Sequence, residues 1–334
     1  MKRLLFVFVG VIALTAVLLT DCSKKSGGAK EDFILKIGYG GSLCEAPIHT
    51  AYEKGFFEEE GLKTEIIKFA PGTTFDGVTS GQIDASFALL ASIIQPLANG
   101  LPAKITTGLH TGCDIVLVKP NSGITKAADL KGKKIGIASM TSSPVIYAKR
   151  VLGDNGVNVR MEDSEVEFVV YNLSDLPLVL ANGTVDAIAV NEPTATIAVN
   201  ANGFKILFDS AVDEPYRHQY CCVAYVSDRL LKRDKDIAAR YTRALQKAAK
   251  YIDGNQDEIT RIQVEKKYVA GDPAVNAEVI KKFSYIPSVS GAYEAFGITA
   301  PALQKIGMLN ADVDPVVLQK NSFVFLDGLD EKYK

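Results

Sequence analysis

Apolar and polar positions follow two patterns along the chain, one typical of strands and one typical of helices. Residues 33–39, 64–69 and 85–90 predict strands, and residues 47–54 and 75–80 between them predict helices. Strands that alternate with helices favour a parallel sheet with helices on both faces. In such a sheet ligands collect at the carboxyl ends of the strands, so the loops that follow the strands are candidate binding segments.

Residues 129–152 form a second unit of this kind, a strand, a hydroxyl-rich loop and a helix. Ser143 suits the N-cap of this helix and Pro144 its first position, where the missing N–H costs nothing. The loop before the cap presents free N–H groups and hydroxyls, and such a helix start receives anionic or polar groups. A plain capping role explains the same residues. The apolar positions of the helix fall on one face: Val145, Ile146, Ala148, Val151 and Leu152.

Short motifs occur twice, in the same order and at nearly the same offset. The sequence Lys-Ile-Gly at residues 36–38 returns at residues 134–136, and the Gly-x-x-Asp-Ala motif that begins at Gly81 returns at Gly183. Two copies at a nearly constant offset indicate two similar α/β lobes. A solenoid would have shorter and more numerous repeats.

Two apolar segments outside these repeats are predicted to cross between the lobes. Residues 104–118 are long and apolar with breaks at Gly108 and Gly112, and residues 220–226 form the return crossing. Beyond residue 228 the pattern is helical, and we expect these helices to pack on the first lobe. The predicted domains are a first lobe of residues 33–112 and 223–334 and a second lobe of residues 113–222.

The N-terminus has the pattern of an export signal. A basic start precedes an apolar run over residues 4–19, which is shorter than the roughly 20 residues of a membrane span. The segment before Cys22 resembles a bacterial lipobox, although Asp21 stands where a small residue is expected. We therefore expect a signal peptide at residues 1–21, lipidation of Cys22, a polar tether at residues 22–32, and a protein anchored to the outside of the cell membrane. An uncleaved anchor, or a plain signal peptide with an incidental cysteine, is the alternative.

The composition narrows the class of partner. The 334 residues are 47% hydrophobic and 23% charged, which is an ordinary globular composition and long enough for two domains. The formal net charge of −2 argues against nucleic acid, whose binders carry a strong basic excess. The sequence has no Ser-His-Asp spacing, Walker loop or metalloprotease helix. We predict no enzymatic activity, no cofactor and no bound metal, and we expect a monomer.

Four motifs in order resemble those of a known family. They are residues 51–57 with the Glu-Gly-Leu that follows, residues 81–85, residues 129–136 and residues 183–193. With the lipobox before them, they make the chain similar to the extracytoplasmic solute-binding proteins of ABC importers in the nitrate, sulfonate, taurine and thiamine-pyrimidine group. The resemblance implies a type II periplasmic-binding-protein fold, in which two α/β lobes joined by two crossing strands close on a ligand. It also implies a membrane permease and an ATPase as partners.

The candidate ligand contacts lie in the loops that follow the predicted strands. None of these segments contains Lys or Arg, so a heteroaromatic or hydroxyl-rich solute such as a pyrimidine vitamin precursor is favoured over nitrate or sulfate, unless Arg217 reaches the site. A sulfonate-like compound stays open, and a structural turn is the alternative role of Glu192. The candidates are Tyr39, Gly41, Ser42, Cys44, Leu90, His110, Cys113, Ser139, Thr141, Ser142, Ser143, Asn172, Asn191 and Glu192.

Every histidine lies near a cysteine in the sequence, and three interpretations stay open. They are ordinary packing, a Cys44–Cys113 disulfide in an oxidising compartment, and a site for a soft metal or a metal complex at the hinge. A pyrimidine-synthase-like enzyme is a further alternative, because that enzyme of thiamine biosynthesis resembles these binding proteins and uses a cysteine-rich iron motif. The export signal argues against it. The groups are Cys44 with His49, His110 with Cys113, and His218 with Cys221 and Cys222.

Overall fold

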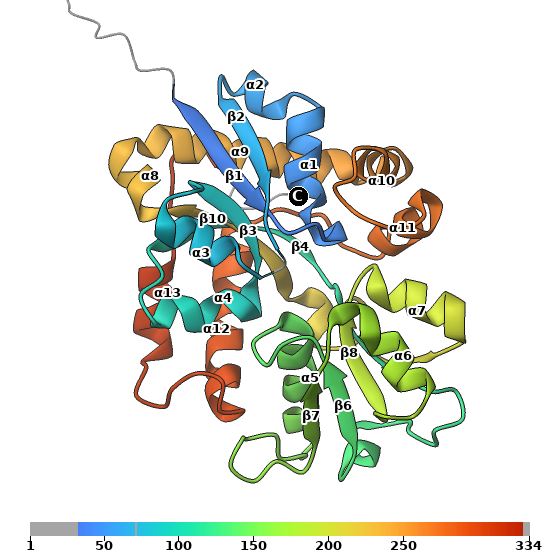
Figure 1. Cartoon of the computed structure of the whole chain (residues 1–334). Coiled ribbons are helices and arrows are strands. Elements are labelled where there is room, and N and C mark those ends of the chain that lie inside the picture. Colours follow the sequence, from blue (N-terminus) through green and yellow to red (C-terminus); the bar gives the residue numbers. More distant parts are fainter. Residues whose placement is uncertain (1–32, 71, 330–334) are drawn as a thin grey trace, which may run out of the picture. The chain divides into compact units, whose positions relative to one another are not determined.

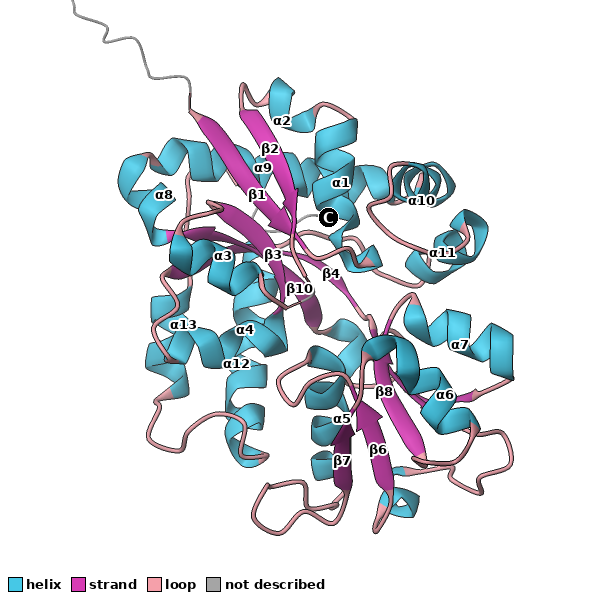
Figure 2. Cartoon of the chain, viewed as in Figure 1, coloured by secondary structure: helices cyan, strands magenta, loops and turns pink. Residues whose placement is uncertain are grey.

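The computed structural model describes residues 33–70 and 72–329. These residues form two five-stranded sheets with helices packed beside them (Figure 1, Figure 2). Within the described ranges no helix has the length and apolar character that a membrane span requires. The predicted signal peptide, the lipidation site at Cys22 and the tether lie outside the described residues.

The first sheet contains the strands predicted before residue 100. β1 pairs in parallel with β2 and β3, whereas β10 runs antiparallel to β3 and to β4. Across the sheet the order is β2 (Lys63–Lys68), β1 (Ile34–Tyr39), β3 (Ala85–Leu89), β10 (Tyr220–Ser227) and β4 (Ala103–Thr111).

The second sheet repeats this plan. β6 pairs in parallel with β7 and β8, whereas β5 runs antiparallel to β8 and to β9. In both sheets the antiparallel fourth strand follows a crossing from the other lobe, so the chain forms two α/β lobes joined by two crossings, as predicted. The order is β7 (Glu167–Val170), β6 (Lys134–Ile137), β8 (Ala187–Asn191), β5 (Asp114–Val118) and β9 (Lys205–Asp209).

The aspartate of the repeated Gly-x-x-Asp-Ala motif makes the same pair of hydrogen bonds in each lobe. The backbone N–H of Asp84 donates to the carbonyl of Lys36 at 2.8 Å, and the Asp84 carboxylate accepts from the N–H of Lys36 at 3.1 Å. Asp186 makes the same two contacts with Lys134, both at 2.9 Å. The aspartate therefore fixes the start of one strand against the start of its parallel neighbour.

The helices connect the strands and then return to the first lobe. α9 contacts α1, α2 and β4, and α12 and α13 also contact β4, which confirms the predicted return. The α-helices are α1 (Ala46–Glu53), α2 (Phe56–Glu59), α3 (Thr74–Ser80), α4 (Leu90–Ala98), α5 (Ser143–Asp154), α6 (Leu176–Ala181), α7 (Thr194–Asn202), α8 (Asp228–Arg233), α9 (Lys235–Ile252), α10 (Gln256–Glu265), α11 (Pro273–Ile280), α12 (Val289–Lys305) and α13 (Pro315–Ser322). Short 3₁₀ helices are η1 (Leu43–Glu45), η2 (Ala127–Leu130), η3 (Leu173–Asp175) and η4 (Tyr216–His218).

The first crossing is made of two strands and not of one, because the segment 104–118 breaks at Gly112. This glycine has φ +66°, and a Cβ on it would lie 2.5 Å from the Cα of Ala211 on the returning segment. Only glycine therefore fits where the two crossings touch. The return crossing ends where β10 begins, at Tyr220, so the predicted lobe boundary after residue 222 falls inside this strand.

Helix α5 begins one residue earlier than predicted. Its N-cap is Ser142 and not Ser143, and the side chain of Ser142 makes no cap hydrogen bond. Pro144 is accordingly the second helical residue. The hydroxyl of Ser143 points to a different partner, which belongs to the site described below.

The paired aspartates allow a matched stability test. Asp84 is 6% exposed and also accepts a hydrogen bond from Arg229 at 2.8 Å, whereas the side chain of Asp186 is 38% exposed. We expect Asp84→Ala to lower the free energy of unfolding by about 2 kcal/mol and Asp186→Ala by about 1 kcal/mol, because burial makes unpaired groups more costly. Urea denaturation measures both. A larger loss in Asp186→Ala would contradict this account.

Candidate functional site

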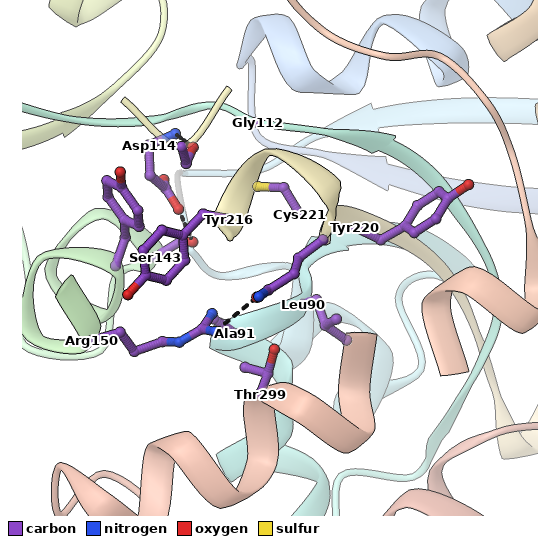
Figure 3. A pocket seen from close by; sticks show the side chains of 13 residues that line it. Leu90, Ala91, Gly112, Asp114, Ser143, Arg150, Tyr216, Tyr220, Cys221 and Thr299 are labelled. Carbon is purple, nitrogen blue, oxygen red and sulfur yellow. Dashed lines mark hydrogen bonds between the residues drawn. The ribbon is translucent and has the colours of Figure 1, made fainter. Parts of the chain in front are cut away.

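A small cavity is lined by residues of both lobes, including α4 of the first and α5 of the second (Figure 3). Its volume is about 40 Å³, enough for a few water molecules but less than a typical organic ligand occupies. An organic solute therefore fits only if the walls move apart. The lining residues are Leu90, Ala91, Gly112, Asp114, Ser143, Tyr147, Arg150, Ser210, Tyr216, Gln219, Tyr220, Cys221 and Thr299.

Asp114, the first residue of β5, is the acidic group of the cavity. It is 4% exposed, and the hydroxyl of Ser143 donates a hydrogen bond to its Oδ2 at 2.5 Å (Figure 3). Burial raises the pKa of Asp114 well above its usual range, and the nearby Cys221 raises it further. Burial therefore favours the neutral carboxyl group, which donates one hydrogen bond and accepts others through its carbonyl oxygen.

Arg150 is the basic group of the cavity. Its Nη2 donates to the Oε1 of Gln219 at 2.7 Å, and its guanidinium carbon lies 5.1 Å from the ring centroid of Tyr216. The buried Nε has no hydrogen-bond partner among the described residues. An unpaired buried donor costs free energy, so this N–H is a natural contact for an acceptor group of a solute.

One face of α5 supplies three polar side chains to the cavity. Ser143, Tyr147 and Arg150 are spaced four and three residues apart, which places them on the same side of a helix. The hydroxyl of Tyr147 donates to Asp213 at 3.2 Å. Arg150 was not among the predicted contacts, because the prediction for this helix used only its apolar positions. The same periodicity, applied to the polar positions that begin at Ser143, would have found it.

The structure brings only part of the predicted site together. Leu90 and Ser143 line the cavity, and Cys113 lies between two of its lining residues, Gly112 and Asp114. Ser139 and Thr141 are exposed, and Ser142 is partly exposed and bonds to the carbonyl of Ser139. Outside the lining residues are Tyr39, Gly41, Ser42, Cys44, His110, Ser139, Thr141, Ser142, Asn172, Asn191 and Glu192. Their contact with a ligand stays a prediction.

The backbone N–H groups of the loop after β1 bind the side-chain carboxylate of Glu45. Glu45 is 4% exposed, and its side chain accepts hydrogen bonds from the N–H groups of Gly40 and Gly41, both at 2.6 Å, and of Ser42 at 2.7 Å. Burial raises the pKa of Glu45 to about 7, against the opposing effect of these donors. The N–H groups of Gly41 and Ser42, two of the predicted ligand contacts, are therefore used within the chain.

Two other predicted contacts have local partners in the second lobe. Glu192 is buried and accepts hydrogen bonds from the N–H and the hydroxyl of Thr196, at 2.9 and 2.8 Å, which supports the start of α7. Asn172 is exposed and bonds to Asp175 at 3.1 Å. Arg217 pairs with Glu214 at 2.7 Å and does not line the cavity.

The cysteines converge, but only one histidine joins them. Cys44, Cys113, Cys221 and Cys222 are free thiols in the structure and lie close together at the junction of the lobes. The ring of His110 contacts the carbonyl of Cys44. His49 is stacked on Tyr268 with ring centroids 4.4 Å apart, and burial lowers its pKa to about 3. His218 is exposed and pairs with Glu214.

The two lobes, each with a five-stranded sheet of the same order, and the cavity lined by both have the architecture of the type II periplasmic-binding-protein fold. The chain belongs to the NMT1/THI5 like family, whose model matches residues 45–259. Among solved structures it is similar to the alkanesulfonate-binding protein of Xanthomonas axonopodis pv. citri bound to MOPS. The TM-score is 0.70 at 19% identity, over 85% of this chain and 97% of that one.

Two curated relatives have different functions in their names. A Bacillus subtilis protein assigned provisionally as an aliphatic sulfonates-binding protein is 28% identical over 260 residues, which are 75% of each chain. The 4-amino-5-hydroxymethyl-2-methylpyrimidine phosphate synthase of Aspergillus parasiticus is 23% identical over 280 residues, 81% of each chain. The relatives of the chain therefore include one named for sulfonate binding and one named as a pyrimidine phosphate synthase.

The raised pKa of Glu45 predicts a pH-dependent stability. Its folded pKa of about 7 lies above the ordinary value of 4.5, so the stability that it contributes is complete below pH 4.5 and is lost as the pH rises to 7. Relative to Glu45→Gln, we expect the wild type to lose about 1–3 kcal/mol between pH 4.5 and pH 8. Urea denaturation at the two pH values measures this. A difference between the two proteins that does not change with pH would refute it.

Proposed function

We propose that this chain is the solute-binding subunit of an ABC uptake transporter, which captures a small organic solute in the cavity and delivers it to a membrane permease. The proposal rests on two buried groups of the cavity, one acidic and one basic. Asp114 accepts a hydrogen bond from Ser143, and the Nε of Arg150 has no hydrogen-bond partner among the described residues. The sulfonate binding in the names of two relatives supports it. The protein acts outside the cytoplasm as a lipid-anchored monomer.

The two groups select the chemistry of the solute. A sulfonate oxygen matches Arg150, because a guanidinium donates charge-assisted hydrogen bonds to oxyanions. An amino group or a ring N–H of a heteroaromatic compound matches Asp114. The proposed solute therefore carries an acceptor or anionic group at Arg150 and a donor group at Asp114, as an aminosulfonate or an aminopyrimidine does.

Capture requires the lobes to move. The cavity is smaller than such a solute, and the lobes are connected by the segment around Gly112 and by the segment between β9 and β10. A hinge motion at these two crossings opens the cavity, and a solute that contacts both walls shifts the population toward the closed form.

A pyrimidine-synthase-like enzyme is the second candidate, and the match to the Aspergillus parasiticus synthase favours it. The two functions differ in what happens to the solute. A binding protein releases a pyrimidine unchanged, whereas a pyrimidine phosphate synthase forms it as its product. Mass spectrometry of a cell extract incubated with and without the purified chain, and with no pyrimidine added, separates them, because only a synthase increases the amount of pyrimidine phosphate.

Single substitutions in the cavity test which solute class is bound. We expect Arg150→Ala to weaken binding of an aliphatic sulfonate by about 10- to 100-fold, because a charged hydrogen bond of about 1.5–3 kcal/mol is lost. We expect Asp114→Ala, which removes both side-chain oxygens, to weaken binding of an aminopyrimidine by about 10-fold, because a buried hydrogen bond is lost. Isothermal titration calorimetry of the wild type and both variants against the two compounds measures this.

Arg160→Ala is the matched control, since this guanidinium is 49% exposed and interacts with Glu162 outside the cavity. It should leave both affinities unchanged. If sulfonates and aminopyrimidines fail to bind the folded wild type, or if Arg160→Ala weakens binding as much as Arg150→Ala, the cavity is not the site.

Lipidation makes a separate prediction at the N-terminus. Cys22→Ala is expected to move the protein from the membrane fraction to the soluble extracytoplasmic fraction, because one lipid-bearing thiol is the proposed anchor. Fractionation of cells with an immunoblot measures this. Retention of the variant in membranes would mean that the apolar residues 4–19 are the anchor.

A further inference from the structure

The four cysteines of the described residues gather at one point from three distant segments. Cys44 lies in η1 after β1, Cys113 lies between β4 and β5, and Cys221 and Cys222 lie at the start of β10. The Sγ atoms of Cys44, Cys113 and Cys222 are all within 4.8 Å of one another, and the Sγ of Cys221 is 2.8 Å from that of Cys113. Cys44, Cys113 and Cys222 are at most 1% exposed.

An irregularity in β10 explains how two consecutive cysteines reach the same cluster. Neighbouring residues of a regular strand point to opposite faces. The pairing of β10 with β4 shifts register between Tyr220, which faces Thr111, and Cys222, which faces His110. A bulge at this point re-aims one side chain, so that Cys221 and Cys222 both approach Cys113.

We propose that these four thiols bind one soft metal ion with a filled d shell, such as Zn²⁺ or Cu⁺. Each thiol releases one proton as it coordinates, and no electron is transferred. In a tetrahedral zinc site with Zn–S bonds of about 2.3 Å the sulfur atoms are about 3.8 Å apart, which agrees with the spacing of Cys44, Cys113 and Cys222, all within 4.8 Å of one another. The Sγ of Cys221 is 2.8 Å from that of Cys113, so on coordination it moves away from Cys113 by about 1 Å. Soft thiolate ligands select such ions over Mg²⁺ or Ca²⁺.

A disulfide explains the cluster less well than a metal does. A disulfide joins two sulfur atoms, whereas three of these thiols are all close to one another. Any single disulfide leaves two of the four thiols without a role. A metal ion uses all four side chains, and Cys221, which also lines the solute cavity, is the ligand that faces the cavity.

His110 packs beside the cluster. Its two ring nitrogens lie 3.1 Å from the carbonyl oxygens of Thr111 and Cys44, so the ring contacts the backbone that carries one of the proposed ligands. His110 is held in place by Phe283, whose ring is stacked at 5.1 Å.

The experiment uses the full chain with Cys22→Ala, so that the only thiols are the four of the cluster. The protein is purified under reducing conditions, and Zn²⁺ is titrated in competition with a chromophoric chelator. We expect one Zn²⁺ per chain, and substitution with Co²⁺ should give the charge-transfer absorption of a thiolate site. Cys113→Ser should weaken Zn²⁺ binding by roughly 100-fold or more, because a direct ligand should matter at least as much as a group that orients one.

Two further variants keep the test decisive. Cys221→Ser changes the most exposed thiol and should fold like the parent, yet bind Zn²⁺ about 10-fold or more weakly. His218→Ala removes an exposed imidazole beside Glu214 and controls for binding at the surface, so its Zn²⁺ affinity should equal that of the parent. Circular dichroism confirms folding.

Three results would overturn the proposal. The first is a folded, reduced parent protein that binds no Zn²⁺, or whose Zn²⁺ binding is lost in His218→Ala. The second is unchanged Zn²⁺ affinity in a folded Cys221→Ser variant. The third is a Cys113–Cys221 disulfide, found by peptide mapping of the protein isolated without reductant.

Discussion

The structure depends on the antiparallel strand that each sheet receives after a crossing. β10 pairs with β3 and β4 in the first sheet, and β5 pairs with β8 and β9 in the second. Since the residues before both strands must pass between the lobes, the two crossings are forced to lie together, close enough for Gly112 to meet Ala211. Asp114 and Ser210 of the cavity, and Cys113 and Cys221 of the cluster, lie on or beside these crossings.

The two crossings also place a carboxyl group of the cavity beside a thiol of the cluster. Asp114 begins β5 immediately after Cys113, and Ser210, whose hydroxyl accepts from the N–H groups of both residues at 2.8 and 2.9 Å, follows β9. The solute cavity and the thiol cluster are therefore built on the same few residues of backbone. A hinge motion that opens the cavity also acts on the segments that hold the thiols, so binding at one place is expected to affect the other.

The sequence predicts the fold well because the fold rests on local patterns. The repeated motifs at Gly81 and Gly183 predict two similar lobes, and in the structure Asp84 and Asp186 make equivalent hydrogen bonds. The predicted strands and helices before residue 100 are present, with ends that differ by one or two residues.

The site was less predictable because its contacts join residues that are distant in the sequence. Ser143 resembles a helix cap until Asp114, 29 residues earlier, is seen to accept its hydroxyl. Gly41 and Ser42 follow a predicted strand and were therefore candidate ligand contacts, and only the structure shows that their N–H groups donate to Glu45. The role of Arg150 could not be predicted from its partner, because Gln219 lies 69 residues away in the sequence. Its helical spacing from Ser143 could have indicated that it lies on the same side of the helix.

If the cavity between the lobes is the binding site, it holds a solute in the cell. Mass spectrometry of the small molecules released when the chain, purified from its own cells without added ligand, is denatured measures this. We expect one polar organic compound, close to equimolar with the wild-type chain and strongly depleted from Arg150→Ala but not from Arg160→Ala. A solute that is equally abundant in all three proteins would show that the cavity is not the site, as would the absence of any solute from a folded wild type that also binds none on titration.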